Sequence, residues 1–279
     1  MSQSQLDVVK SMYDERSEQY DENDVHVRQA QDYITWADLK EGENLLDLAC
    51  GTGLVAIGAK SVVGPSGRVV GVDISEGMLK VARRKAQAAG LDIAFLNHDV
   101  CDLAGLHIVP KEDYTDEFFD VITCAAALIL LPDPLQAVKN WKSVLRPGGR
   151  LITDVQTKDA NVVMNIFSAI APQVGETVPW HSHLWQSQQA LATLMVDAGF
   201  HVDKVFETEA YAKAQYHLDT APELFDKAVS KAMFKDFGRA DICEKAKDLF
   251  VRKFAEIAGS KDTIEEETRY WVTVATRPG

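Results

Sequence analysis

The sequence is short of basic residues and of long apolar runs. Lys and Arg number 29 against 42 Asp and Glu, so the formal net charge of the 279 residues is −13 at pH 7. This balance disfavours nucleic acids and anionic membrane surfaces as partners, because both are bound through clustered Lys and Arg. The longest apolar stretch, 121–131, is far too short to span a bilayer. We therefore expect that the protein binds neither nucleic acid nor membrane.

Paired cysteines are also lacking. The four cysteines, Cys50, Cys101, Cys124 and Cys243, show no C-x-x-C spacing. This usage predicts reduced thiols in a cytoplasmic protein and no metal site built on cysteine pairs. The first residues, MSQSQLD, contain neither a basic segment nor an apolar one. We therefore expect no secretory signal peptide.

A glycine turn between two apolar runs is the most informative feature that is present. Residues 45–53 read LLDLACGTG, and the next apolar run, 69–73, ends at Asp73, twenty positions after Gly53. A strand that ends in a glycine turn, with an acid at the tip of the next strand, is typical of a nucleoside-binding βαβ unit. Glycine lets the backbone approach a ligand, and the acid can accept hydrogen bonds from ribose hydroxyls.

Strand and helix patterns alternate along the rest of the chain. We expect strands at 45–48, 68–73, 93–96, 119–124, 150–154, 202–207 and 268–276. We expect helices at 5–38, 55–63, 75–89, 134–145 and 188–198, and two more within 221–258. This alternation predicts a parallel sheet in an α/β domain.

Four motifs follow one another within 44–155. They are Asp47-Leu-Ala-Cys-Gly51-Thr-Gly53, then Asp73, then Asn97-His98-Asp99, and finally Leu145-Arg-Pro-Gly-Gly149. In this order they resemble the class I S-adenosylmethionine-dependent methyltransferases. A nicotinamide site would place a third glycine where this chain has Ala56, a change that either class tolerates. The downstream motifs therefore favour S-adenosylmethionine as the cofactor.

The resemblance implies a fold and a division of the chain. The fold is a Rossmann-like, seven-stranded, mostly parallel sheet of order 3-2-1-4-5-7-6 with the last strand antiparallel, carrying helical lid insertions. One methyltransferase domain would span 1–279. It would comprise an N-terminal helical cap at 1–40, a cofactor-binding core at 44–157, and lid or acceptor insertions at 158–185 and 221–258. The apolar faces of these insertions leave a dimer surface open as the alternative to a lid.

The resemblance also implies roles for individual residues. Asp47 would organise the turn near the methionine end of the cofactor, Asp73 would accept from both ribose hydroxyls, and Asp99 would bond the adenine amino group. The full set of expected cofactor-binding residues is Tyr20, Arg28, Asp47, Ala49, Gly51, Gly53, Asp73, Ile74, Met78, Asn97, Asp99, Val100 and Ala125. Tyr20 or Arg28 would pair with the methionine carboxylate, although a packing aromatic and a solvated charge remain the alternatives.

The segment 180–185, WHSHLW, is the candidate for an acceptor site. Trp180 and Trp185 could wall an apolar pocket, and His181 or His183 could take a proton from the acceptor. A structural role and metal ligation by the two histidines stay open. Cys50 and Cys124 lie at the carboxyl ends of neighbouring strands, where both thiols could line the cofactor pocket. Burial among apolar residues would make them inert instead of catalytic.

Shorter stretches of the sequence indicate the class of methyl acceptor. The central segment is most similar to ubiquinone and menaquinone biosynthesis methyltransferases, whereas 12–21 and 26–29 resemble fungal enzymes that methylate dithiol metabolites, of the gliotoxin type. We expect thiol S-methylation of a small dithiol secondary metabolite, because a thiolate is a strong nucleophile that needs little help. The alternatives are O- or C-methylation of a quinone or polyketide-type metabolite, and a non-catalytic regulatory protein that binds the cofactor. The sequence leaves the oligomeric state open.

Overall fold

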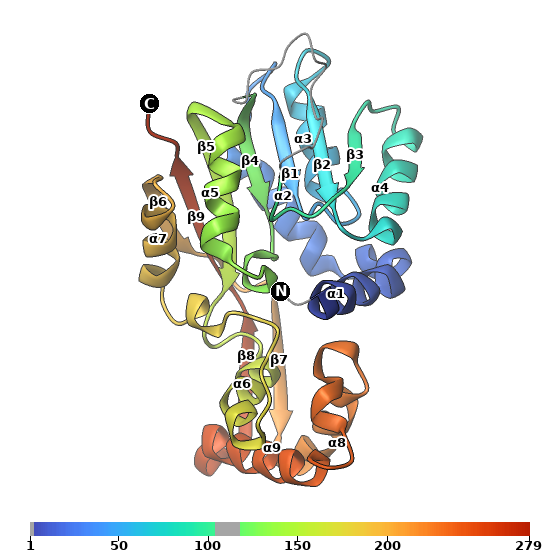
Figure 1. Ribbon diagram of the computed structural model, residues 1–279, viewed down its shortest axis with the longest axis vertical. Coiled ribbons are helices and arrows are strands. Elements are labelled where there is room, and N and C mark those ends of the chain that lie inside the picture. Colours follow the sequence, from blue (N-terminus) through green and yellow to red (C-terminus); the bar gives the residue numbers. More distant parts are fainter. Residues whose placement is uncertain (1–2, 104–117) are drawn as a thin grey trace.

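The computed structural model describes residues 3–103 and 118–279, and its centre is a seven-stranded sheet of order β3-β2-β1-β4-β5-β9-β6 (Figure 1). The strands are β1 (Leu45–Leu48), β2 (Val69–Asp73), β3 (Ala94–Asn97), β4 (Phe119–Cys124), β5 (Leu145–Gln156), β6 (His201–Glu207) and β9 (Tyr270–Thr276). Strands β1 to β5 pair in parallel, and β9 runs antiparallel to both β5 and β6. The predicted strand order is therefore confirmed, with β9 as the seventh strand.

Helices cover both faces of this sheet. Strands β1 and β2 are buried along their whole length, as their near-continuous apolar sequences require. On one face pack α2 (Asp24–Ala37), α3 (Leu54–Val63) and part of α4 (Glu76–Ala88). On the other pack α5 (Pro134–Val144) and α7 (Gln188–Asp197). This arrangement leaves the carboxyl ends of the parallel strands as the edge where a ligand can bind.

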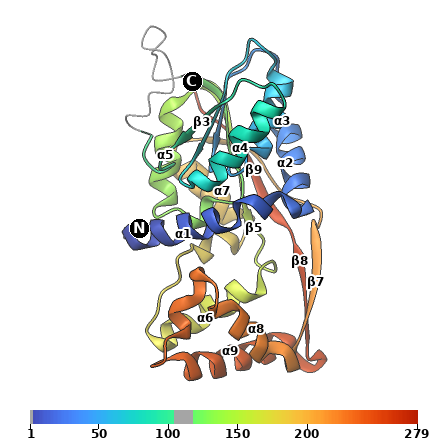
Figure 2. The same ribbon diagram turned by 90° about the vertical axis from the view of Figure 1, so that its right-hand side faces the viewer.

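The N-terminal region is helical, as predicted over 5–38, but it is divided into three helical segments. It consists of α1 (Gln3–Arg16), the 3-10 helix η1 (Ser17–Glu22) and α2, here called the cap. Asn23 causes the break, since its extended backbone stops η1 while its side chain accepts a hydrogen bond from Val25 N and begins α2. As a result α1 crosses below the carboxyl ends of the strands while α2 packs on the sheet (Figure 2).

A second covering lies below the same edge and is here called the lobe. It contains α6 (Val162–Val174), α8 (Ala221–Val229), η6 (Ala232–Gly238), α9 (Cys243–Ala258) and a two-stranded ribbon of β7 (Ala212–His217) and β8 (Thr263–Thr268). The predicted strand over 268–276 corresponds to β9, whereas the two strands of the ribbon, β7 and β8, are absent from the prediction. Three consecutive glutamates in β8 and an exposed β7 hide the apolar alternation that marks a half-buried strand.

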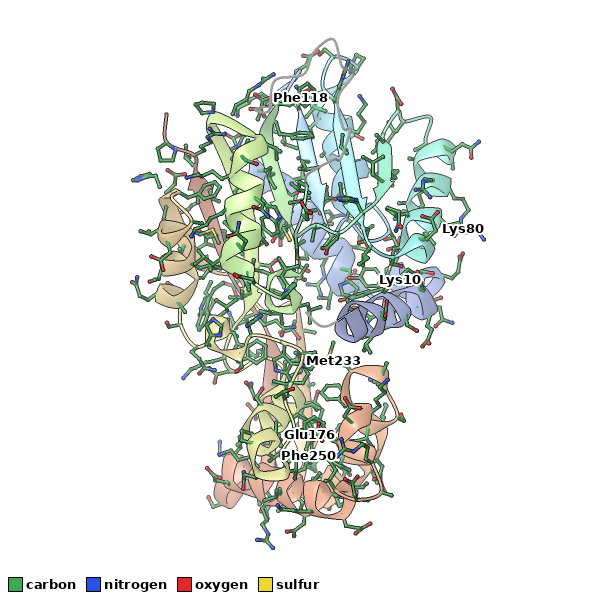
Figure 3. All side chains as sticks on the ribbon, in the orientation of Figure 1. Lys10, Lys80, Phe118, Glu176, Met233 and Phe250 are labelled. Carbon is green, nitrogen blue, oxygen red and sulfur yellow. The ribbon has the colours of Figure 1, made fainter. Side chains whose placement is uncertain are left out.

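The lobe packs around an aromatic cluster, which is continuous with the apolar core on one face of the sheet. The ring of Phe167 lies 4.7 to 5.7 Å from the rings of four other phenylalanines, namely Phe225, Phe234, Phe237 and Phe250. Figure 3 shows Phe250 inside the lobe and Met233 at the lobe's edge facing α1. Among the residues described, no helix combines the length and the apolar character needed to cross a membrane.

Candidate functional site

Three adjoining cavities open at the carboxyl ends of the strands. The cofactor cavity, about 700 Å³, lies between the glycine turn, the tip of β2 and the cap. A second cavity, about 440 Å³ and here called the inner cavity, lies between the turn and α2. The junction cavity, about 1740 Å³, lies between the cap and the lobe. Tyr20 and Ala126 line all three.

The two glycines of the first motif serve different purposes. Gly51 has φ +55, lines the cofactor cavity, and would place a Cβ in open space, so its bare backbone leaves room for a ligand. Gly53 has φ +77 and begins α3, and a Cβ there would come within 3.0 Å of the Phe95 ring. Gly53 lines neither the cofactor cavity nor the inner cavity, and its role is to let α3 pack closely on the sheet.

Asp73 faces the cofactor cavity from the tip of β2. One carboxylate oxygen accepts from Gly51 N at 2.8 Å and the other from Ser75 N at 2.8 Å. Burial raises the pKa of this carboxyl, and the backbone hydrogen bonds oppose that rise. A carboxylate has about four acceptor positions, so Asp73 retains acceptor capacity for two further donors such as a pair of hydroxyls.

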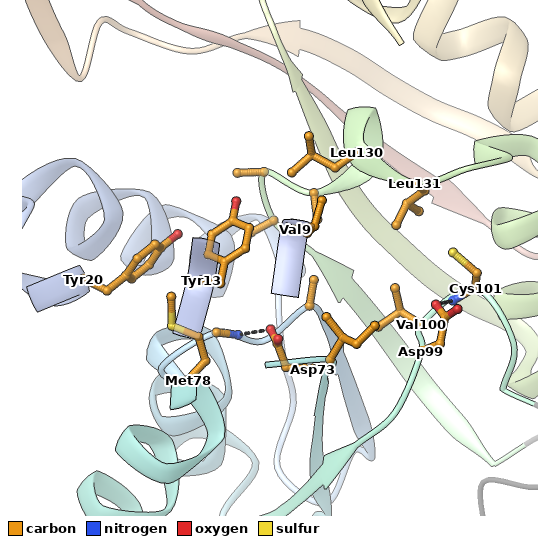
Figure 4. A pocket seen from close by; sticks show the side chains of 16 residues that line it. Val9, Tyr13, Tyr20, Asp73, Met78, Asp99, Val100, Cys101, Leu130 and Leu131 are labelled. Atoms are coloured by element: carbon orange, nitrogen blue, oxygen red, sulfur yellow. Dashed lines mark hydrogen bonds between the residues drawn. The ribbon is translucent and has the colours of Figure 1, made fainter. Parts of the chain in front are cut away.

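The far end of the cofactor cavity is lined by the loop after β3. Asp99, Val100 and Cys101 line it, and Asp99 is fixed by accepting from Cys101 N at 2.9 Å (Figure 4). Trp141 of α5 holds this loop by donating from Nε1 to the Val100 carbonyl at 2.7 Å. Met78 lines the same cavity from α4 and presents an apolar surface suited to a flat ring.

Other residues of the predicted set shape these cavities. Ala49, Ile74 and Ala125 line the cofactor cavity. Asn97 does not, and its side chain instead donates to the Asp73 and Ile74 carbonyls at 3.2 and 2.8 Å, which ties β3 to the tip of β2. Asp47 borders the inner cavity, and its carboxylate accepts from Ala56 N and Thr123 Oγ1.

The cap closes the cofactor cavity from the opposite side. Tyr13 and Tyr20 line both the cofactor cavity and the junction cavity, with Val9 beside them (Figure 4). The Arg16 guanidinium lies 5.4 Å from the centre of the Tyr13 ring and 5.2 Å from that of Tyr20. The His26 ring stacks on Tyr20 at 4.2 Å, and burial lowers the His26 pKa to about 4, so this imidazole is neutral near pH 7.

The structure corrects the prediction for Arg28. Its guanidinium donates to Asp24 at 2.6 Å and to the Tyr211 carbonyl, and it lines none of the three cavities. Gln29 and His26 of the same helix face the inner cavity instead. Neighbouring helical positions point about 100° apart, and residues 26, 29, 30 and 33 have the spacing of one helix face. That spacing, present in the sequence, was the signal for the inward residues.

The structure also corrects the prediction for residues 180–185. Trp180 and Trp185 are buried core side chains, and neither they nor His181 and His183 line any of the three cavities. Trp180 donates from Nε1 to Ser168 Oγ at 2.9 Å, and His181 Nε2 lies 3.1 Å from the Pro132 carbonyl oxygen. The segment packs behind 129–131, and it is those residues that reach the cavities.

Cys50 and Cys124 are buried, whereas Cys101 and Cys243 are partly buried. Burial raises the pKa of the Cys50 and Cys124 thiols well above the usual value, and raises that of Cys101 to about 12. Protonated thiols of this kind are poor nucleophiles. Within residues 3–103 and 118–279, no three His, Cys, Asp or Glu side chains are grouped so that they could hold a metal ion.

Comparisons with known proteins agree with this geometry. A family profile described as "Methyltransferase domain" matches residues 39–208, which is more than half of the chain. The ubiquinone/menaquinone biosynthesis C-methyltransferase of Bdellovibrio bacteriovorus is 29% identical over 222 residues, covering 75% of this chain and 90% of that protein. The demethylmenaquinone methyltransferase of Bacillus cytotoxicus is 29% identical over 245 residues, covering 80% and 99%.

Solved structures share the fold. The YcgJ protein of Bacillus subtilis superposes with a TM-score of 0.55 at 19% identity, covering 90% of this chain and 99% of that one. At this identity the likeness concerns the fold alone.

Proposed function

This chain belongs to the methyltransferase-domain family, and from that premise we propose that it transfers a methyl group to the sulfur of a small thiol metabolite. The methyl donor is S-adenosylmethionine, whose sulfonium supplies an electrophilic methyl group when it is bound. The observation that supports sulfur as the acceptor atom is the position of Arg16.

The described residues fit the cofactor. Gly51 leaves the backbone bare beside the cavity, Asp73 has free acceptor positions for the ribose hydroxyls, and Met78 offers an apolar face to the adenine ring. Asp99 and Val100 would receive the adenine edge. We assign the methionine end to the inner cavity, where Gln29 and His26 supply polar side chains.

The acceptor would enter through the junction cavity. Four residues line both this cavity and the cofactor cavity, namely Tyr13, Tyr20, Ala126 and Leu130. The acceptor atom must approach the methyl carbon in line, so it would lie beside these four residues. The lobe, which carries Met233 and Phe234 on the opposite wall, would shield the acceptor from water as a lid.

Arg16 supplies positive charge at this point. It lines the junction cavity and contacts the rings of Tyr13 and Tyr20, two of the four shared residues. A nearby cation lowers the pKa of an acid by about 1 to 3 units. A drop of about 1.5 units brings a thiol from about 8.5 to near 7, whereas a phenol that starts near 10 stays mostly protonated. Among neutral acceptors, the thiol gains most from this cation.

A second candidate is C-methylation of a quinol. The two curated relatives carry names that describe methylation in ubiquinone and menaquinone biosynthesis. The junction cavity also has aromatic walls that would suit a ring, including Tyr270 and Phe234.

An acceptor panel with isotopically labelled S-adenosylmethionine separates the two candidates. We expect mass spectrometry to find the label on sulfur when a reduced small dithiol is supplied, and little label on a demethylmenaquinol analogue. Label on the quinol carbon alone would contradict sulfur as the acceptor atom.

Arg16→Met should move the pH–rate profile of the thiol reaction to higher pH by about one unit, because the charge is lost while the stem is kept. Arg252→Met serves as the matched control, since Arg252 pairs with Asp248 on the surface of α9. An unchanged profile in the Arg16 variant would remove the proposed role of the cation.

A further inference from the structure

Ala126 has an unusual backbone conformation for a residue with a side chain. It follows β4 with φ +53, in the left-handed region, which is strained for residues other than glycine. It is also one of the two residues that line all three cavities. Backbone strain of this kind persists only where the surroundings hold it, and it gathers at functional sites.

The side chain of Asp154 holds this backbone. One carboxylate oxygen accepts from Ala126 N at 3.0 Å, and the other accepts from Tyr33 OH at 2.6 Å and from Gln29 Nε2 at 2.8 Å. Asp154 lies on β5 and is 1% exposed. The carboxylate therefore joins the loop after β4 to α2 of the cap.

The residue just before this loop is fixed as well. The Cys124 carbonyl accepts from Thr153 Oγ1 at 2.8 Å, and the Tyr33 hydroxyl oxygen lies 3.1 Å from the same carbonyl oxygen. Asp47 is equally buried, but the backbone amide that it accepts from belongs to Ala56 inside α3, which lines none of the three cavities. Asp154 is thus the buried carboxylate whose hydrogen bond ends on a strained residue facing the cavities.

We propose that Asp154 is a positioning residue for methyl transfer, because it fixes Ala126 where the cofactor and junction cavities meet. The carboxylate keeps the loop in its left-handed conformation and transmits the position of α2 to it. Without the carboxylate, Ala126 would relax toward an ordinary φ and shift the wall against which donor and acceptor align. A misplacement of about 1 Å can reduce a rate by about 100-fold.

This inference rests on the proposed transfer at the junction but not on sulfur as the acceptor. It is therefore tested with whichever acceptor the wild-type protein methylates in the panel. A failure of the thiol assignment would change the acceptor used and leave the comparison of variants intact.

The test combines three variants with one control. We expect single-turnover methyl transfer to fall about 10-fold in Tyr33→Phe and about 100-fold in Asp154→Asn, with the cofactor Kd changed by less than about 3-fold. Ala126→Gly removes the strain and the methyl group, and it should lower the rate while the melting temperature stays close to that of the wild type. Tyr211→Phe removes a hydroxyl bonded to Asp32 on the outward side of α2, and we expect it to leave the rate unchanged.

Two results would overturn the proposal. Unchanged transfer rates in Tyr33→Phe and Ala126→Gly would show that the loop needs no such support. Cofactor affinity that falls in parallel with the rate in all three variants would show that the network only maintains the fold. Because Tyr33→Phe and Ala126→Gly each make a small change, the test holds even if Asp154→Asn does not fold.

Discussion

The cap and the lobe cover the same edge of the sheet but are held by different forces. Helix α2 of the cap is packed into the core of the sheet, but α1 and η1 are attached through carboxylates. Asp14 accepts from Ser75 Oγ at 2.6 Å and from Gly77 N at 2.8 Å, while Asp21 bonds Thr52 and, at 2.6 Å, Lys85. The lobe is held by the aromatic rings packed around Phe167. Partly exposed polar contacts are each worth about 1 kcal/mol or less, whereas a buried aromatic side chain contributes several.

Because of this difference, we expect the cap to open and the lobe to keep its shape. The cofactor cavity is closed by the cap, so the cofactor can be exchanged at the cost of a few polar contacts. The lobe forms the far wall of the junction cavity, and its aromatic cluster, which is continuous with the core of the sheet, maintains its shape. Cofactor exchange and acceptor shape are therefore controlled by different regions.

The largest expected effect comes from the lobe core. Phe167→Ala should destabilise the protein by about 3 to 5 kcal/mol, because it removes the ring at the centre of the aromatic cluster. Chemical denaturation measures this loss, and acceptor methylation should fall further than cofactor binding. Val196→Ala is the control, since Val196 is 59% exposed. Equal stability of the two variants would contradict the conclusion that the aromatic cluster stabilises the lobe.

The next effect concerns pH at the place where the cap meets the sheet. Burial raises the pKa of Asp154 to about 7, whereas the unfolded chain has a value of about 3.9. Between these values the folded chain keeps a proton that the unfolded chain has lost, so this group's contribution to stability falls as the pH rises. The melting temperature of the wild type minus that of Asp154→Asn should therefore shrink by about 3 °C or more from about pH 5 to about pH 8.

The pKa of His26 is lowered by burial, so its contribution to stability changes with pH in the opposite direction. His26 is present in both the wild type and Asp154→Asn, so its contribution cancels when the two melting temperatures are subtracted. Asp47 also has its pKa raised to about 7 by burial, and Asp47→Asn should give a difference of the same sign. A gap that widens with rising pH would contradict this account.

The smallest effect comes from the polar contacts of the cap. Asp14→Asn and Asp21→Asn should each cost about 1 kcal/mol or less and speed cofactor release about 5-fold, because the closed cap loses a charged contact. Stopped-flow measurement of cofactor dissociation gives the rate. Asp248→Asn removes an exposed ion pair on α9 and should change nothing. A release rate unaffected by either cap variant would mean that the cap is not the gate.

The sequence predicted the sheet well because its strands are short apolar runs with sharp boundaries. The run 119–124 and the acid Asp73 needed no tertiary information, since glycine turns and buried strands leave local signals. The acceptor side was predicted poorly. The segment 180–185 has the composition of a pocket wall, yet it packs behind the loop that forms the wall. Arg28 was predicted to bind the cofactor, but the residue that faces the cavity is its neighbour in α2, Gln29.

Tertiary contacts decided the features that were missed. Asp154 lies in a strand that was predicted, but its partners Tyr33 and Ala126 are far from it in the sequence. The ribbon β7–β8 pairs 212–217 with 263–268, and its charged, exposed strands lack an apolar face that a pattern could show. Long-range polar pairing of this kind leaves no periodic signal.

The most direct test of the account is a crystal structure of the whole chain with S-adenosylhomocysteine and a methylated dithiol product. We predict that the product sulfur lies in the junction cavity, in contact with Tyr20 and Leu130. It should lie about 3 to 4 Å from the position that the methyl carbon occupies when it is bonded to the sulfur of S-adenosylmethionine. A product bound elsewhere, or one that reaches the cofactor without touching the wall shared by the two cavities, would contradict the proposed site of transfer.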